Sequence, residues 1–269
     1  MATLVSFHAH PDDEAICCGG TLRKAAADGH RAVLVVATRG ELGEVVPGVL
    51  EPGESLASRR VAETEEAARL LGVHRVEFLG YRDSGMMGAA TNTEPGAFWA
   101  ADLDEAAERL AAILRAEAAD VLTVYDSHGG YGHPDHIQVH RVGLRAADLA
   151  GTPRVYQQTV NRDRMRRGRK AFAARAVQAG MELPGPADEE FLDTFGSPES
   201  EITAAIDVSA HALDKRAAIR AHASQVSEKS VWLAMPEEGF RFAFGTEFYI
   251  RAGQGPGITE TDLFAGLPG

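Results

Sequence analysis

Short apolar stretches alternate with longer amphipathic stretches through the first 160 residues of the chain. The short stretches are rich in branched and aromatic residues, which favour strands, and the longer ones place apolar residues every three or four positions, which is typical of helices. Gly29 and Gly72 stand where two of these helices are expected to end. The alternation predicts βαβ units, and therefore an α/β fold with a mostly parallel sheet flanked by helices.

We expect a single domain, residues 1–269, with a Rossmann-like core at 1–160 that carries the chemical site. Residues 161–269, where the pattern is less regular, form a smaller C-terminal extension that packs beside the core and shapes the substrate pocket. The core strands are predicted at Leu4–His8, Ala32–Ala37, Arg75–Leu79, Val121–Tyr125 and Arg154–Thr159, and the core helices at Glu14–Asp28, Ser55–Leu71, Asp102–Glu117 and Asp135–Leu149. In the extension we expect a strand at Ile202–Val208, a helix at Ala210–Ala223 and a strand near Phe242–Arg251.

A strongly basic segment, residues 162–175, begins the extension and is followed by a loop at Pro184–Pro186. We predict a helix outside the core here. Its basic residues form either a solvated helix face, the simpler interpretation, or a rim that attracts an anionic substrate.

Composition narrows the class of protein. With 45% hydrophobic and 25% charged residues the chain is typical of a globular protein, and its net charge of -12 argues against a nucleic-acid partner. No apolar stretch approaches the roughly 20 residues that span a bilayer, so we expect no membrane contact and a cytoplasmic location. Two adjacent cysteines, Cys17 and Cys18, give no disulfide framework. The sequence leaves a homo-oligomer open.

Five ionisable side chains lie within residues 8–14, where the first strand meets the first helix. Ligands of open α/β sheets bind outside the carboxyl ends of the strands, so this position favours chemistry. His10 and Asp13 supply an imidazole and a carboxylate, both acceptable ligands for Zn²⁺ or a similar divalent ion. Asp12 stands between them and can take a proton from water at the ion, as a general base does.

The glycines that follow, Gly19 and Gly20, do not indicate a dinucleotide site. A phosphate-binding glycine loop belongs in the turn between strand and helix, and here that turn is filled with carboxylates that repel a pyrophosphate. We expect these glycines to let the helix pack closely on the sheet.

A second polar cluster, residues 126–136, follows the fourth predicted strand. Asp135 is expected at the start of a helix, and His136 is the ligand that completes a His₂Asp set with open coordination positions, as in a catalytic site. His140, one helical turn later, is the alternative ligand.

The remaining residues of this cluster suit acid and oxyanion chemistry. His133 is then free beside the ion, with Asp135 able to orient or charge it, and an imidazolium there can polarise an acyl oxygen or protonate a leaving amine. Tyr131 lies among glycines that permit an unusual backbone, which suits a phenol that moves over the reacting carbonyl. The alternative for Tyr131 is a plain loop aromatic.

The chain resembles the LmbE-like, or PIG-L, metal-dependent deacetylases, which act on N-acetylglucosaminyl conjugates. The resemblance is carried by His10-Pro11-Asp12-Asp13-Glu14 with Gly19-Gly20-Thr21, by His133-Pro134-Asp135-His136, and more weakly by Arg60-Val61-Ala62-Glu63, Arg82-Asp83-Ser84-Gly85 and His222-Ala223-Ser224-Gln225. Within the family the chain is similar to members of the mycothiol pathway, a glucosaminyl-inositol deacetylase and a conjugate amidase.

The resemblance implies the same metal ligands and base as the spacing, namely His10, Asp13 and His136 with Asp12. It also implies that His133 stabilises the oxyanion or acts as acid, with Asp135 tuning it and Tyr131 assisting, and that Arg60 and Asp83 contact the sugar. Cys17 matches neither the lysine of the amidase nor the serine of the deacetylase.

Taken together, these patterns predict a metal-dependent hydrolase that removes an acetyl group from an N-acetylated amino sugar conjugate, with Zn²⁺ as the expected ion and Fe²⁺ or another divalent metal as alternatives. One alternative function is an amidase for a bulkier thiol conjugate or natural-product intermediate. Another is a metal-dependent sugar-binding module without turnover.

Overall fold

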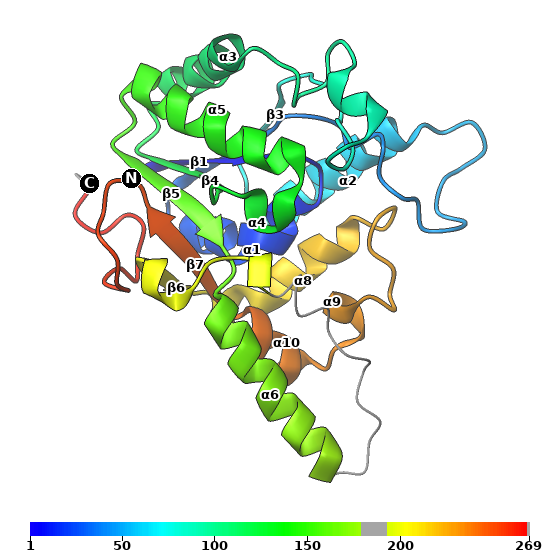
Figure 1. Cartoon of the computed structure of the whole chain (residues 1–269), viewed down its shortest axis with the longest axis vertical. Helices are drawn as coiled ribbons and strands as arrows, with labels where there is room; N and C mark the ends of the chain where they lie inside the picture. Colours follow the sequence, from blue (N-terminus) through cyan, green and yellow to red (C-terminus); the bar gives the residue numbers. More distant parts are fainter. Residues whose placement is uncertain (179–192, 268–269) are drawn as a thin grey trace.

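Seven strands form one sheet in the computed structural model, which describes residues 1–178 and 193–267, with side chains to residue 171 and from 193 (Figure 1). They are β1 (Thr3–His8), β2 (Arg31–Val36), β3 (Arg75–Phe78), β4 (Val121–Tyr125), β5 (Arg154–Thr159), β6 (Ala204–Asp207) and β7 (Thr246–Arg251), in the order β3-β2-β1-β4-β5-β7-β6. The first five strands are parallel, and β7 runs antiparallel to both neighbours. The predicted mostly parallel α/β fold is confirmed; the loop predicted at Pro184–Pro186 lies outside the described residues.

The helices agree with the predicted ones to within about two residues in the core. They are α1 (Asp13–Ala27), α2 (Leu56–Leu71), α3 (Leu103–Ala116), α4 (Gly129–Gly132), α5 (Pro134–Ala150), α6 (Arg162–Gln178), α8 (Ala212–Ala221), α9 (Val231–Ala234) and α10 (Glu237–Phe244), with short 3₁₀ turns at Ala90–Thr93, Glu199–Glu201 and Ser209–His211. None of the described helices has both the length and the apolar character that a bilayer span requires.

The strand predicted near Phe242–Arg251 begins too early. The strand starts at Thr246, because the residues before it form α10. Phe240 is buried and contacts Phe244, with ring centroids 4.8 Å apart and the rings tilted by 42°, while Phe242 is 74% exposed. Aromatic residues at every second position give the alternating pattern of a strand. Here only Phe240 and Phe244, four residues apart, share a face, which is the spacing of a helix.

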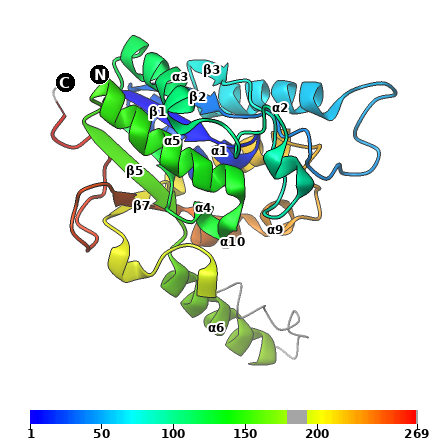
Figure 2. The same ribbon diagram turned by 45° about the horizontal axis from the view of Figure 1, so that its top comes forward.

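Alternate residues of the sheet enter two different hydrophobic clusters. Val5 and Phe7 of β1 pack with α3 and α5, whereas Leu4 packs with α1, α2 and α8 on the opposite face. Figure 2 shows the sheet between these two helical layers. Because side chains alternate across a strand, a parallel strand covered on both faces is apolar throughout, which explains the unbroken apolar stretches of the sequence.

The two glycines of α1 lie against the C-terminal extension. α1 is kinked at Cys18 (φ -138°, ψ 20°), and beyond the kink the backbone N–H groups of Gly20 and Thr21 donate to the two carboxylate oxygens of Glu247 on β7, at 2.9 and 2.8 Å. A Cβ on Gly20 would come within 2.5 Å of the Val208 side chain. The sequence predicted that these glycines allow close packing on the sheet, and the close packing occurs at the antiparallel edge, beside β6 and β7. The kink leaves two N–H groups inside the helix free to bond to the Glu247 carboxylate.

The basic segment forms α6, which projects away from the body of the molecule (Figure 1). Three of its arginines contact residues 193–199. Arg162 donates to the carbonyls of Phe195 and Gly196, Arg166 pairs with Asp193, and Arg167 pairs with Glu199. None of the described α6 residues lines the cavity at the sheet edge, so the geometry favours a helix face that is partly neutralised by its surroundings.

Candidate metal centre and active site

The candidate site lies where the strand order of the sheet reverses. β1 pairs with β2 on one side and with β4 on the other, so the chain leaves β1 and β4 at the same edge while the two crossovers run in opposite directions. Such a switch point leaves a crevice outside the strand ends. The loops after β1 and β4 carry the two polar clusters of the sequence, and this edge therefore positions both.

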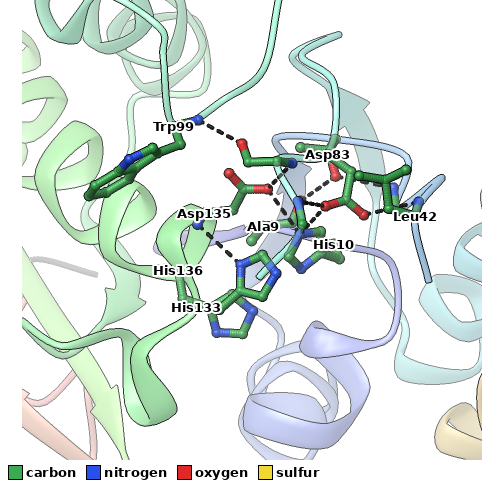
Figure 3. Close-up of polar contacts among 12 residues, drawn as sticks. Ala9, His10, Leu42, Asp83, Trp99, His133, Asp135 and His136 are labelled. Carbon is green, nitrogen blue, oxygen red and sulfur yellow. Dashed lines mark hydrogen bonds and ion pairs between the residues drawn. The ribbon is translucent and has the colours of Figure 1, made fainter. Parts of the chain in front are cut away.

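Two imidazoles from these separate loops, His10 and His136 (Figure 3), converge on the carboxylate of Asp13. The Nδ1 atom of His10 lies 3.5 Å from Oδ2 of Asp13, and the Nε2 atom of His136 lies 3.4 Å from the same oxygen. The backbone N–H of His10 also donates to this oxygen at 2.9 Å. Burial raises the pKa of Asp13, but the neighbouring His136 and His10 outweigh it and hold this pKa well below its usual range.

These three side chains fit a divalent cation. All are buried, and the Nε2 atom of His136 has no hydrogen-bond partner, although its Nδ1 atom faces the carbonyl of Gly129 at 3.2 Å. Two imidazoles and a carboxylate form a donor set that Zn²⁺ accepts, and Fe²⁺ accepts it as well. His133 is a further candidate, since its ring offers a nitrogen within 4.8 Å of nitrogens of His10 and His136.

Asp12 lines the same cavity as Asp13. The two groups of possible metal ligands found among the described residues are His10 with His133 and His136, and His10 with Asp83 and Asp135; neither includes Asp12 or Asp13. Its backbone has φ 98°, a conformation rare outside glycine, and its N–H donates to Oε2 of Glu14 at 3.0 Å. Burial raises the pKa of this carboxyl to about 6, although the Arg60 guanidinium, 3.3 Å away, acts in the opposite direction. A carboxylate with a raised pKa is suited to accept a proton near neutral pH.

The two expected sugar contacts, Arg60 and Asp83, line the cavity at this edge but also have internal partners. Arg60 is almost fully buried and donates to the carbonyls of Gly40 and Pro11. Asp83 accepts N–H groups from Leu42 and Gly85. These bonds position both side chains, and the predicted contact with a sugar stays a prediction.

His133 and Tyr131 also line this cavity, which has a volume of about 240 Å³. The Nδ1 atom of His133 accepts the backbone N–H of Asp135 at 3.1 Å, so His133 is itself the N-cap of α5. Burial, followed by the charges of His10 and His136, lowers the pKa of His133 to about 4. Tyr131 is 44% exposed, and its ring centroid lies 5.0 Å from that of His136.

Asp135 does not face the residue that we expected it to orient. Its carboxylate is fully buried, and Oδ2 lies 3.2 Å from Nε2 of His10 and accepts the N–H of Ser84 at 2.9 Å. His133 uses the backbone of Asp135 for its cap, which leaves the Asp135 side chain free to point toward the loop after β1. The Asp135 charge still raises the pKa of His133 through space. The alternative ligand His140 faces the carbonyl of Tyr125 at 3.0 Å.

Several supporting contacts come from residues outside the predicted catalytic, metal-binding and sugar-binding sets. Glu14 is fully buried and its Oε1 lies 2.6 Å from Nε2 of His222 in the C-terminal extension. Ser224 donates its N–H and hydroxyl to Glu63, three residues after Arg60 in α2. These residues belong to the motifs that carry the family resemblance, so the sequence did mark them as candidates. Which residue pairs with which depends on tertiary structure and could not be predicted.

A second buried network lies beneath His136. The Tyr125 ring stacks on the His136 ring with centroids 4.4 Å apart, and the Tyr125 hydroxyl lies 2.9 Å from Nδ1 of His8. His8 in turn contacts Ser6 and the buried thiol of Cys18. Cys17 is only partly buried. Because burial lowers the pKa of His8 to about 4, this network is neutral and packs the floor of the site.

The fold and this site define an α/β enzyme class with a buried histidine and carboxylate centre at the switch point of its sheet. The PIG-L family, described as GlcNAc-PI de-N-acetylase, matches residues 5–147, and the chain belongs to this family. It is 41% identical to the 1D-myo-inositol 2-acetamido-2-deoxy-alpha-D-glucopyranoside deacetylase of Geodermatophilus obscurus, covering 99% of this chain and 98% of the relative. It is 43% identical to the same enzyme of Streptomyces avermitilis, covering 98% and 97%.

Solved structures support the fold at lower identity. The N,N'-diacetylchitobiose deacetylase of Pyrococcus horikoshii shares 22% identity with a TM-score of 0.59, covering 93% of this chain and 83% of that one. GalB, the 4-carboxy-2-hydroxymuconate hydratase of Pseudomonas putida KT2440, shares 18% with the same TM-score, covering 94% and 97%. Since a hydratase and a deacetylase share this fold, the fold alone does not fix the reaction. The family and the closer relatives confirm the predicted class, an enzyme that deacetylates an N-acetylglucosaminyl conjugate.

Proposed function

We propose that this enzyme is a zinc-dependent deacetylase of a glucosaminyl-inositol conjugate, with the metal held by His10, Asp13 and His136. The observation that carries this proposal is the convergence of both imidazoles on Asp13 Oδ2, with the Nε2 atom of His136 buried and without a hydrogen-bond partner. The substrate class follows from the relatives above 40% identity, which are named for an acetamido-glucopyranosyl inositol.

When bound, a divalent cation acts as a Lewis acid on an acyl oxygen and on water. Asp12 accepts the proton of the attacking water, because its carboxyl has a raised pKa and lies beside the candidate ligands. The Asp135 N–H donates to Nδ1 of His133, which leaves the ring proton on Nε2. His133 and the Tyr131 hydroxyl can then donate to the oxygen where negative charge develops. The protonated Asp12 returns the proton to the leaving amine, because a pKa of about 4 leaves His133 neutral and without a second ring proton to transfer.

A second candidate, hydrolysis of a bulkier amide, is favoured by the rim of the cavity. Leu42 and Met86 line it and are 46% and 54% exposed, and Tyr131 adds a third exposed apolar surface. Apolar side chains around a polar cavity can bind a larger acyl group or aglycone. A panel that compares acetyl with longer acyl groups on the same glucosaminyl-inositol separates the two functions.

The base and ligand assignments are tested with Asp12→Asn and His136→Ala. We expect Asp12→Asn to lower kcat/KM for acetate release by about 10²- to 10⁴-fold while the protein keeps its metal, and His136→Ala to lose the metal itself. Asparagine tolerates the positive φ of position 12 better than most residues, so the backbone is preserved. Near-normal activity of Asp12→Asn would refute the base assignment, and metal loss from that variant would make Asp12 a ligand. Anaerobic metal analysis and reconstitution with Zn²⁺ or Fe²⁺ identify the ion.

A further inference from the structure

The two histidines that face Asp13 share one arrangement. Each turns one ring nitrogen toward Asp13 Oδ2 and the other toward a buried acceptor. For His136 the acceptor is the backbone carbonyl of Gly129, 3.2 Å from Nδ1. For His10 it is the carboxylate of Asp135, 3.2 Å from Nε2. The acceptors differ in charge, because one is a neutral peptide group and the other a carboxylate.

We infer that Asp135 is the positioning residue of His10: it holds the Nε2–H of the imidazole and thereby turns the Nδ1 lone pair toward the metal. This inference rests on the proposed metal centre. It differs from the role expected from the sequence, in which Asp135 orients or charges His133. The hydrogen bond between Asp135 and His133 involves only the Asp135 backbone, whereas the Asp135 side chain contacts His10.

The Asp135 oxygen that faces His10 also bonds to a second segment of the chain. The N–H of Ser84 donates to the same Oδ2 at 2.9 Å, and Ser84 is fixed in turn, since its carbonyl accepts from Asn92 and its hydroxyl accepts the N–H of Trp99. Figure 3 shows the Asp135 carboxylate between this segment and His10. A carboxylate oxygen that bonds both to a fixed backbone N–H and to His10 has little freedom to turn toward His133.

Asp83 is the other carboxylate near the Nε2 atom of His10, and it contributes less to positioning the imidazole. Its Oδ1 lies 3.6 Å from Nε2 of His10, beyond hydrogen-bond distance, and it accepts the N–H of Gly85. Asp83 also lines the cavity, whereas Asp135 does not. The geometry therefore assigns the hydrogen bond of the His10 Nε2 atom to Asp135. It leaves the Asp83 carboxylate facing the cavity, where it can contact a substrate.

A carboxylate behind a metal-bound imidazole fixes the tautomer and ring orientation and makes the ligand more basic, and losing such a partner typically costs 10- to 100-fold in metal affinity. The effect of Asp135 is therefore expected in metal binding before it appears in the chemical step. A residue that only adjusts His133 would change the reaction and leave metal affinity unaltered.

The test measures the metal dissociation constant of the full-length protein by competition with a chromophoric Zn²⁺ chelator. We expect Asp135→Ala to weaken zinc binding about 10- to 100-fold. We expect a smaller loss in Asp135→Asn, which keeps an oxygen for the Nε2–H. The matched control is Asp126→Asn, because Asp126 is another buried acid after β4 whose carboxylate bonds to Gly130 and Thr159 and not to His10; its zinc affinity should equal that of the wild type.

Wild-type zinc affinity in Asp135→Ala, together with a reduced kcat at saturating zinc, would overturn the inference and return Asp135 to a role at His133. If the alanine variant does not fold, Asp135→Asn decides: weakened zinc binding supports the inference, and wild-type binding overturns it. A wild-type protein that binds no zinc or other divalent metal contradicts the proposed function instead, so the two failures are distinguishable.

Discussion

The two loops that form the site are built differently. The loop after β1, residues 9–14, is held by buried side chains from elsewhere in the chain, such as Arg60 on the Pro11 carbonyl and His222 on Glu14. The loop after β4 contains Gly129, Gly130 and Gly132, all with positive φ, and an exposed Tyr131 between them. The candidate base and the proposed metal ligands His10 and Asp13 thus belong to a fixed half, whereas the phenol belongs to a half whose backbone is permissive.

The difference between the fixed and the permissive loop can be tested by substitution, and we expect the largest loss of activity and stability at Glu14. Glu14→Ala removes the acceptor of the Asp12 N–H and leaves His222 buried without its partner. We expect kcat to fall about 10²-fold, because the base is misplaced, and the free energy of unfolding to fall by roughly 3–5 kcal/mol. Steady-state kinetics and urea unfolding measure the two effects separately.

Glu14→Gln is the control for this change. Its amide oxygen can still accept the Asp12 N–H while its NH₂ group faces Nε2 of His222, whose Nδ1 has no hydrogen-bond partner and can carry the ring proton. We expect most of the kcat to return in this variant. If Glu14→Ala is unstable but keeps the wild-type kcat, the fixed loop serves stability alone and the contrast between the loops fails.

A smaller effect is expected from adding one methyl group to the permissive loop, at either of two adjacent glycines. A Cβ on Gly129 would lie 2.6 Å from the Cβ of His136, whereas one on Gly130 has no atom within 4 Å. We expect Gly129→Ala to displace His136 and weaken zinc binding roughly tenfold, in the range for outer partners of a metal ligand. Gly130→Ala should cost about 1–2 kcal/mol of stability, since only its positive φ is strained, and should retain wild-type zinc affinity. Equal zinc affinities in the two variants would show that the loop backbone shifts to relieve the contact with His136 and leaves the imidazole in place.

The smallest effect is expected at Tyr131. Tyr131→Phe keeps the ring and removes the hydroxyl, and loss of one hydrogen bond worth about 0.5–1.5 kcal/mol lowers kcat by roughly 2- to 10-fold. KM and zinc affinity should stay at the wild-type values, because the ring contacts of the half-exposed side chain remain. A loss as large as that of Glu14→Ala would mean that the phenol is held as firmly as the base.

The sequence predicted the fold and the location of the site because both depend on short-range patterns. Strands β1 and β4 are mostly apolar and end at polar clusters, and parallel strands bring such ends to one edge, so His10 and His136 could be placed together without coordinates. The choice of His136 over His140 followed from its position nearer the strand end.

Directions of side chains and pairings over long distances could not be predicted in this way. Asp135 was expected to face its chain neighbour His133, yet its side chain contacts His10, 125 residues away. The partner of Glu14 is 208 residues distant in the chain. Such contacts depend on how the layers dock, and no local periodicity encodes them. The start of β7 was misplaced for a related reason, since burial of Phe240 in the hydrophobic cluster formed with α1, α2 and α8 overrides an alternating pattern.

The carboxylate of Glu247 bonds to N–H groups of α1 that precede it by 226 and 227 residues, and it also pairs with the buried Lys215. A ribosome therefore exposes α1, with the proposed metal-binding loop at its start, long before Glu247, whose side chain bonds to the kinked backbone, has been synthesised. The nascent chain can form the parallel strands early, but the first helix reaches its final state only when β7 arrives. Assembly of this site is thus coupled to the last strand of the sheet to be translated.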